Sequence, residues 1–345
     1  MASTMCRGVT SSSAWSKGKD EAAPSQALRV QWWAVVFDWG SLIVFELWIP
    51  ITIGGAFFQN LRSAMQKHLK GRLSTGGATY VRFFYALPFA LAYCWGVKEF
   101  GSYDLPQWNW TFLAYCVAGS ISQILFTFVL IYLFSFRNFA VGTTLSKTEV
   151  VQIAILGLIL LGDTITLWAA MAIVLSLSGV MVLSLAQSKI SLCNLADSLM
   201  SKPTLVGLLC GAFLGASVVF FRGAGLSLGD GPPFMRAAFA LAVSLVMQTV
   251  MMGVYLLWKE PGEITKVLRN WRPASTVGVF GILASICWFT AFTLQNAAYV
   301  RALGQIELVF TFIFSIFFFK EKTSAMEFLG IVLIVVAIFI LILCG

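Results

Sequence analysis

Charged residues are scarce in this sequence. Lys, Arg, Asp and Glu make up 11% of its 345 residues, 59% of the residues are hydrophobic, and the mean hydropathy is +0.86. A soluble globular domain carries about 25% charged residues, because its surface faces water. The scarcity therefore excludes an ordinary soluble domain. It also favours membrane topology over nucleic-acid binding as the reason for the net charge of +8, since the basic residues lie mainly in short loops.

Histidine and motif-forming cysteine are also lacking. The chain has one histidine, His68, and its seven cysteines form no Cys-x-x-Cys pair. A zinc or similar site needs several such ligands at fixed spacing, so we predict no metal and no cofactor. The phosphate-binding pattern G-x-x-x-x-G-K-[ST] is absent as well, which argues against a transporter driven by ATP.

Long apolar segments fill most of the chain instead. A helix needs roughly 20 apolar residues to cross a bilayer, and segments of that length recur from residue 47 onward. We therefore expect an all-α integral membrane protein with the lipid bilayer as its partner. The ten predicted spans are residues 47–66, 76–97, 110–134, 139–161, 165–186, 204–224, 232–257, 274–296, 300–319 and 324–344.

The chain before the first span has a different composition. Residues 1–29 are rich in Ser, Ala, Gly and Lys, and residues 30–45 are aromatic but contain Asp38. We expect 1–45 to be a disordered extension ending in an interfacial segment. Residues 46–187 and 204–345 then form two five-helix units, joined by a loop at 188–203.

The two units resemble each other in sequence. An offset of 158 residues places Glu149 on Glu307 and Leu145 on Leu303, and an offset of 154 places Arg82 on Arg236. Because each unit has an odd number of spans, the second unit enters the membrane from the opposite side. The sequence therefore predicts an inverted repeat, an architecture typical of secondary transporters, with a site between the halves.

Two glutamates stand deep in predicted spans. Glu149 precedes Asp163 by 14 residues, which is roughly 21 Å along a helix, and Glu307 holds the equivalent place in the second unit. A carboxylate at that depth is costly, so it is a functional candidate by default. We predict that Glu149 and Glu307 bind substrate or protons. The alternative is that each pairs with a basic residue such as Arg82, Arg236 or Lys147 and holds the bundle together.

Further polar residues are assigned to the same site or to helix ends. Arg62 is an intramembrane cation that can bind a carboxylate or phosphate, or can instead anchor its helix at the interface. The other candidates for substrate or proton binding are Lys147, Gln305, Gln59 and Asn60, and the predicted cations at helix entrances are Arg82, Arg236 and Arg301.

These features together resemble the EamA family of the drug/metabolite transporter superfamily. The resemblance covers about residues 46–344. It rests on the five-plus-five repeat, on Arg82 and Arg236 at the second and seventh spans, and on the acids of Gly162-Asp163-Thr164 and Lys320-Glu321-Lys322 that end the fourth and ninth. It implies a non-enzymatic transporter of small metabolites, such as amino acids, in the bacterial inner membrane, working by alternating access. It also implies cytoplasmic termini, whereas the basic loops after the odd spans place both ends of the bundle outside.

Other functions stay open at the level of sequence. A secondary transporter, proton-coupled or facilitative, is the leading hypothesis. An intramembrane enzyme using Glu149 and Glu307 is an alternative, and so is a membrane scaffold or sensor. Small residues at spacing four, Gly207, Gly211 and Gly215, predict close helix packing within the chain, with homodimer contact as the second interpretation.

Overall fold

A computed structural model describes residues 47–69, 72–133, 145–188, 202–229, 231–317 and 323–344. The chain divides into two compact units, Met1–Phe45 and Glu46–Gly345, and all described residues belong to the second. The predicted N-terminal extension and interfacial segment lie outside the described residues. So do most of the predicted loop at 188–203 and the acid Glu321.

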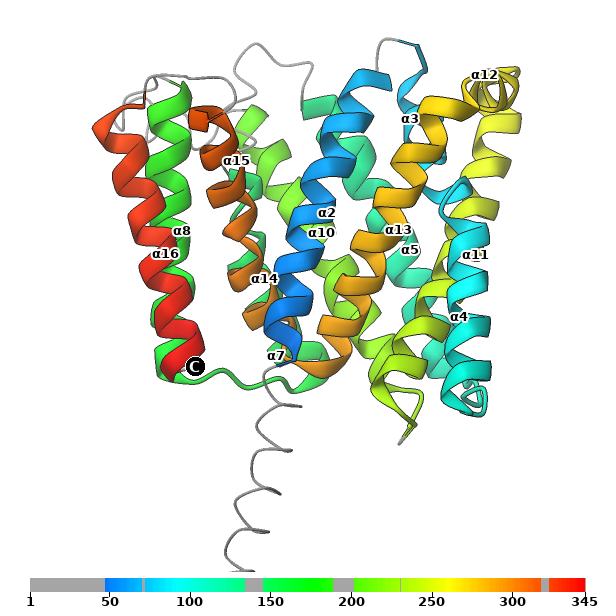
Figure 1. The fold of residues 1–345 in the computed structure, drawn as a ribbon, viewed down its shortest axis with the longest axis horizontal. Coiled ribbons are helices and arrows are strands. Elements are labelled where there is room, and N and C mark those ends of the chain that lie inside the picture. Colours follow the sequence, from blue (N-terminus) through cyan, green and yellow to red (C-terminus); the bar gives the residue numbers. More distant parts are fainter. Residues whose placement is uncertain are drawn as a thin grey trace, which may run out of the picture. The chain divides into compact units, whose positions relative to one another are not determined.

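Every regular element among the described residues is a helix (Figure 1). In the first half of the chain these are α2 (Trp48–Leu69), α3 (Thr75–Phe84), α4 (Leu87–Gly101), α5 (Trp110–Leu133), α7 (Glu149–Leu161) and α8 (Leu167–Ser188). In the second half they are α10 (Lys202–Leu226), α11 (Pro233–Lys259), α12 (Glu263–Arg269), α13 (Trp271–Leu294), α14 (Ala297–Gly304), α15 (Ile306–Phe317) and α16 (Ala325–Cys344).

Six of the described helices are long and apolar enough to cross a membrane: α5, α8, α10, α11, α13 and α16. The prediction of an all-α membrane fold is thus confirmed. The other four predicted spans correspond to α2, to α3 with α4, to α7 and to α14 with α15.

Three predicted spans are wrong as single helices. The span 139–161 is interrupted by the turn at Lys147 and Thr148, directly before α7. The span 76–97 is broken between α3 and α4, because Pro88 lacks an amide hydrogen and its ring clashes with the preceding turn. The span 300–319 is broken at Gln305, between α14 and α15. Just before this break Gly304 lies under Trp288, where an added Cβ atom would come within 2.7 Å of the indole ring.

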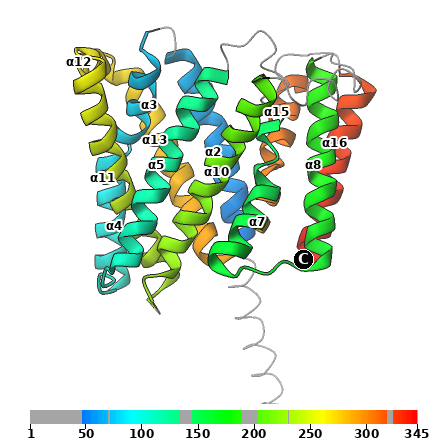
Figure 2. The ribbon, with the colours of Figure 1, turned by 180° about the vertical axis from the view of Figure 1, so that it is seen from behind.

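The two halves of the chain run in opposite senses (Figures 1 and 2). Helices α2, α5, α8, α11 and α14–α15 run one way, whereas α3–α4, α7, α10, α13 and α16 run the other. The packing contacts are related in the same way. Helix α2 of the first half packs on α13 of the second, and the equivalent helix α10 of the second half packs on α5 of the first. The equivalent helices α8 and α16 pack on each other, and so do α4 and α11. These four contacts between halves are therefore related by exchanging the halves, whereas the contact between α3 and α12 has no such counterpart.

Glycines allow the closest helix approaches. A Cβ atom on Gly179 in α8 would lie 2.8 Å from the carbonyl oxygen of Gly330 in α16. One on Gly211 in α10 would lie 2.9 Å from the carbonyl oxygen of Ser146, and Gly215 lies beside Glu149 in α7. The glycine stripe of α10 is thus used for packing inside the chain. The homodimer alternative stays a prediction.

Candidate functional site

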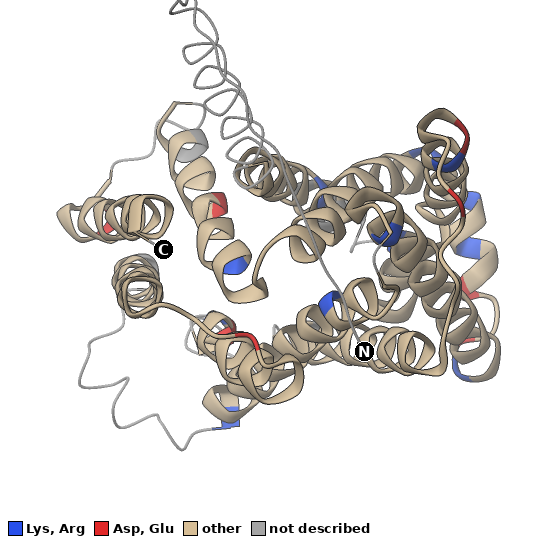
Figure 3. Ribbon diagram, turned by 90° about the horizontal axis from the view of Figure 1, so that it is seen from below, with Lys and Arg blue, Asp and Glu red and all other residues tan. Residues whose placement is uncertain are grey.

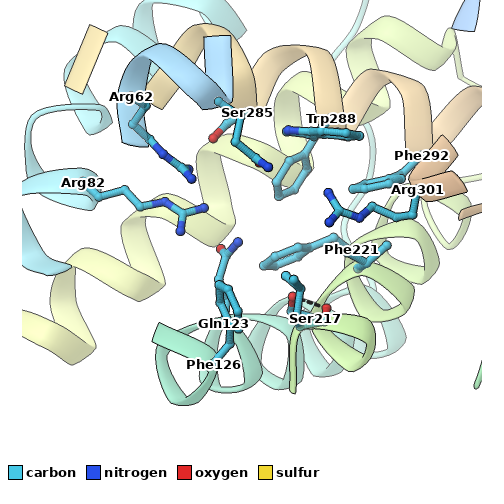
Figure 4. Close-up of a pocket in the computed structure, with 14 residues that line it drawn as sticks. Arg62, Arg82, Gln123, Phe126, Ser217, Phe221, Ser285, Trp288, Phe292 and Arg301 are labelled. Carbon is cyan, nitrogen blue, oxygen red and sulfur yellow. Dashed lines mark hydrogen bonds between the residues drawn. The ribbon is translucent and has the colours of Figure 1, made fainter. Parts of the chain in front are cut away.

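A cavity of about 90 Å³ lies between the two halves (Figure 4). Helices α2, α3 and α5 line it from the first half, and α10, α13 and α14 line it from the second. Polar and aromatic side chains dominate the lining. The polar residues are Gln59, Arg62, Arg82, Gln123, Ser217, Ser285 and Arg301, and the apolar residues are Phe126, Leu214, Val218, Phe221, Trp288, Phe289 and Phe292.

Three arginines approach this cavity. Figure 4 shows Arg62 and Arg82 extending from one side and Arg301 from the other. In the described part of the chain, neither Arg62 nor Arg82 forms an ion pair, and Arg62 Nε is buried without a hydrogen-bond partner. Arg301 is buried, with its guanidinium carbon 5.0 Å from the centroid of the Trp288 ring. The cavity is therefore strongly cationic.

Glu149 begins α7 and is 2% exposed. The residues just before it, Lys147 and Thr148, form a turn, so the carboxylate stands at the start of a helix, where the helix dipole favours negative charge. Its partner is the guanidinium of Arg301 in α14. This ion pair crosses from the first repeat to the second.

Glu307 holds the corresponding place in α15, directly after the break at Gln305. Lys147 donates to Glu307 Oε1 at 2.6 Å, and Gln59 donates to Oε2 at 2.7 Å. Asn60 donates to the backbone carbonyl of Glu307 at 2.9 Å. This ion pair also joins the repeats, but here the acid comes from the second repeat and the cation from the first. Figure 3 shows charged residues inside the bundle as well as at its rim.

The structure thus brings together most of the predicted site residues and corrects three assignments. Arg82 and Arg301, predicted as helix-entrance cations, lie in the last turns of α3 and α14, and both line the cavity. Lys147, predicted to bind substrate or protons or else to pair with one of the glutamates, pairs with Glu307. Arg236 is separate from the cavity lining and donates to the carbonyl of Gly229 at 2.9 Å. Gln305 is buried at the helix break, and its Oε1 has no hydrogen-bond partner within the described chain.

Sequence reasoning missed Arg222 in α10. Arg222 Nε lies 2.7 Å from Asp163 Oδ2 and its Nη2 lies 3.0 Å from Oδ1, which makes a bidentate pair. Its Nη1 also donates to the carbonyls of Phe292 and Gln295, at 2.7 and 2.5 Å. An arginine within the apolar run Val218–Leu226 was the available signal. This cluster, the Arg222 lock, joins the ends of α7, α10 and α13.

A bundle of apolar helices with two repeats in opposite senses, broken helices, and buried charge around a central cavity defines a membrane transporter. The chain belongs to the EamA-like transporter family, whose model matches residues 46–185 and 201–343. It is thus a multi-pass membrane protein of the drug/metabolite transporter type, and the resemblance drawn from its sequence is confirmed.

Comparison with other proteins adds information on the fold alone. A search of curated proteins finds no match to this sequence. One crystal structure, described only as that of a protein, is 12% identical and has a TM-score of 0.63, covering 86% of this chain and 97% of its own.

Proposed function

We propose that this protein is a secondary transporter that moves a small metabolite by alternating access through the central cavity. The proposal includes ten spans arranged as two inverted five-helix repeats, residues 46–187 and 204–345. The observation that carries it is the cavity itself, which both repeats line with helices that run in opposite senses. Placement in a bacterial inner membrane, implied by the resemblance, belongs to the same proposal.

The Arg222 lock supplies a closed face. It ties together the ends of α7, α10 and α13, and it lies directly next to the cavity, because Phe292 lines the cavity and its carbonyl accepts from Arg222. Alternating access requires one face of the site to be sealed while the other is open. We assign the sealed face to this lock, which must break when the cavity opens there.

The paired glutamates fit a transporter better than an intramembrane enzyme. Each carboxylate is engaged by a cation of the other repeat, rather than facing the other carboxylate. We infer that the two pairs hold the broken helices together across the repeat interface. Proton coupling then requires one pair to open during the cycle, whereas facilitated transport does not. Neither a scaffold nor a sensor would require the cationic cavity between the repeats.

Accessibility of a cavity residue tests this proposal without knowledge of the substrate. Ser285→Cys, at a cavity-lining position that is partly exposed, is introduced into a cysteine-free background, in sealed vesicles, and a membrane-impermeant maleimide is applied to either face. Labelling is expected from one face only, and Arg222→Gln is expected to add labelling from the other. Ser178→Cys is the control, since this exposed position on α8 is expected to face lipid and stay unlabelled. Labelling at equal rates from both faces with the lock intact would indicate that neither face is sealed and would contradict the proposed cycle.

A further inference from the structure

We propose that the transported metabolite is an organic anion whose carboxylate or phosphate group binds between Arg62 and Arg82, with its apolar body against the aromatic wall that contains Trp288. This inference rests on the proposed transport function and names the substrate class of the same cavity. It follows from the charge, the hydrogen-bonding capacity and the shape of the cavity.

The charges around the cavity do not balance. Of the three arginines that line it, Arg301 is paired with Glu149, which leaves Arg62 and Arg82 without an ion pair in the described chain. Glu307 acts on Arg62 through space, but its two carboxylate oxygens are already taken by Lys147 and Gln59. Two partly exposed guanidinium groups therefore share one cavity without a dedicated counter-ion in the described chain, and an anion between them would stabilise this arrangement.

The two guanidinium groups face a common space. They are close enough to repel each other, and both extend into the cavity from the same side (Figure 4). An oxyanion placed between them would relieve this repulsion and accept charge-assisted hydrogen bonds from both planar groups. A cationic substrate would add to the repulsion.

Most of the unpaired hydrogen-bonding groups in the cavity lining are donors. Arg62 Nε and Trp288 Nε1 are buried and have no hydrogen-bond partner among the described residues. Gln123 accepts from Gln248 at its amide oxygen, over 2.7 Å, which leaves its amide nitrogen to donate. A ligand that fits this lining has to accept hydrogen bonds, as carboxylates and phosphates do.

The rest of the lining is apolar and aromatic. The rings of Trp288 and Phe292 are stacked, 5.7 Å apart with an interplanar angle of 20°, and Phe126, Phe221 and Phe289 complete the wall. A single water needs about 10–15 Å³ of such space, so the cavity of about 90 Å³ holds the head group of a small molecule. The proposed ligand is thus a small anion with an apolar or aromatic body.

A series of ligands with one aromatic body and different charges tests the proposal. Phenyl phosphate, phenylacetate, phenylalanine and phenethylamine are titrated into the purified protein by isothermal titration calorimetry. We expect phenyl phosphate or phenylacetate to bind and phenethylamine not to bind. The anion that binds with higher affinity shows whether the site recognises phosphate or carboxylate. Binding of phenethylamine as tight as that of the anions, or binding of neither anion, overturns the proposal.

Variants of the arginines locate the site. Arg62→Gln and Arg82→Gln are each expected to weaken binding of the preferred anion at least about tenfold, because each removes a charge-assisted partner. Arg82→Lys keeps the charge and is expected to bind between wild type and Arg82→Gln, which separates a binding role from a folding defect. Arg236→Gln, the repeat mate of Arg82 outside the cavity lining, is the control and is expected to bind as wild type does.

The outcomes also separate this inference from the proposed function. Cysteine accessibility at residue 285 reports alternating access whatever the charge of the ligand. One-sided labelling together with unchanged anion binding in Arg62→Gln and Arg82→Gln overturns the anion site alone. Labelling at equal rates from both faces overturns the transport mechanism itself.

Discussion

The ion pair between Glu149 and Arg301 is expected to show strong coupling in a double-mutant cycle. The perturbations are Glu149→Gln, Arg301→Gln and the two together. Both side chains are almost fully buried, with 2% and 7% of their surface exposed, and they join α7 of the first repeat to α14 of the second. Either single change leaves one charge inside the bundle without its partner.

The size of the effect follows from this burial. Removing one partner of a buried pair costs about 3–5 kcal/mol, because the remaining charge is uncompensated. In Glu149→Gln, the ring of Trp288 would still lie 5.0 Å from the guanidinium carbon of Arg301. This cation–π contact stabilises the folded state by only about 2 kcal/mol even when desolvated, which is less than the cost of losing the carboxylate. At about 2 °C per kcal/mol for a large chain, each single change should lower the Tm by about 6–10 °C. The double change removes both charges and should lower the Tm by less than either single change.

Differential scanning fluorimetry of the purified variants in detergent measures these shifts. Glu99→Gln is a matched control, because its pair with Lys98 has 41% and 48% of the side-chain surfaces exposed, and exposed pairs contribute about 1 kcal/mol at most. Its Tm should stay within about 2 °C of wild type. Additive losses in the double variant would refute the reasoning, since they would mean that the two charges do not stabilise each other.

Three further outcomes are expected. Arg222→Gln should raise the rate of maleimide labelling at residue 285 from the face that the lock seals, because it removes the bidentate pair and two carbonyl contacts. An unchanged rate would mean that other residues seal this face. Burial opposes ionisation of Glu263, but hydrogen bonds from Lys266 and from a backbone amide outweigh it and hold the pKa of Glu263 below its ordinary value of 4.5. The stability that the ionised carboxylate contributes is therefore present above pH 4.5 and is lost as the pH falls through the lowered pKa. Glu263→Gln should therefore flatten the fall of Tm between about pH 5 and pH 3, and a fall as steep as that of wild type would contradict this. Gly179→Ala should cost about 1–3 kcal/mol, measured as Tm, because the new methyl group would lie 2.8 Å from a carbonyl oxygen of α16; a Tm equal to wild type would show that the two helices separate easily.

The sequence was sufficient to predict the repeat and the acids that it preserves. Glu149 and Glu307 stand out because few charges occur in long apolar segments, and one offset relates them. Lys147 was one of several basic residues named as possible partners, but the sequence did not show which acid it pairs with, and the pairing of Arg301 was not predicted. Helical spacing shows which residues of one helix share a face, whereas Arg301 and Lys147 each reach their acid from the other repeat.

Helix breaks were predictable only where a residue enforces them. Pro88 offered a local signal for the break between α3 and α4. The break at Gln305 has no proline, and it coincides with the packing of Gly304 under Trp288 from another helix. Arg222 had a readable signal, a guanidinium in an apolar run, but its partners come from the ends of two other segments.

The symmetry of the fold does not extend to its charges. The repeat offset places Lys147 opposite Gln305 and Arg301 opposite the threonine at position 143, so the two repeats share their acids but not the cations that neutralise them. Exchanging the conformations of the halves therefore cannot reproduce the same set of ion pairs. An inverted repeat with identical halves would have two access states of equal free energy. At each of these equivalent positions only one half of the chain carries a cation. The free-energy difference between the two access states must therefore arise in part from the positions of these cations.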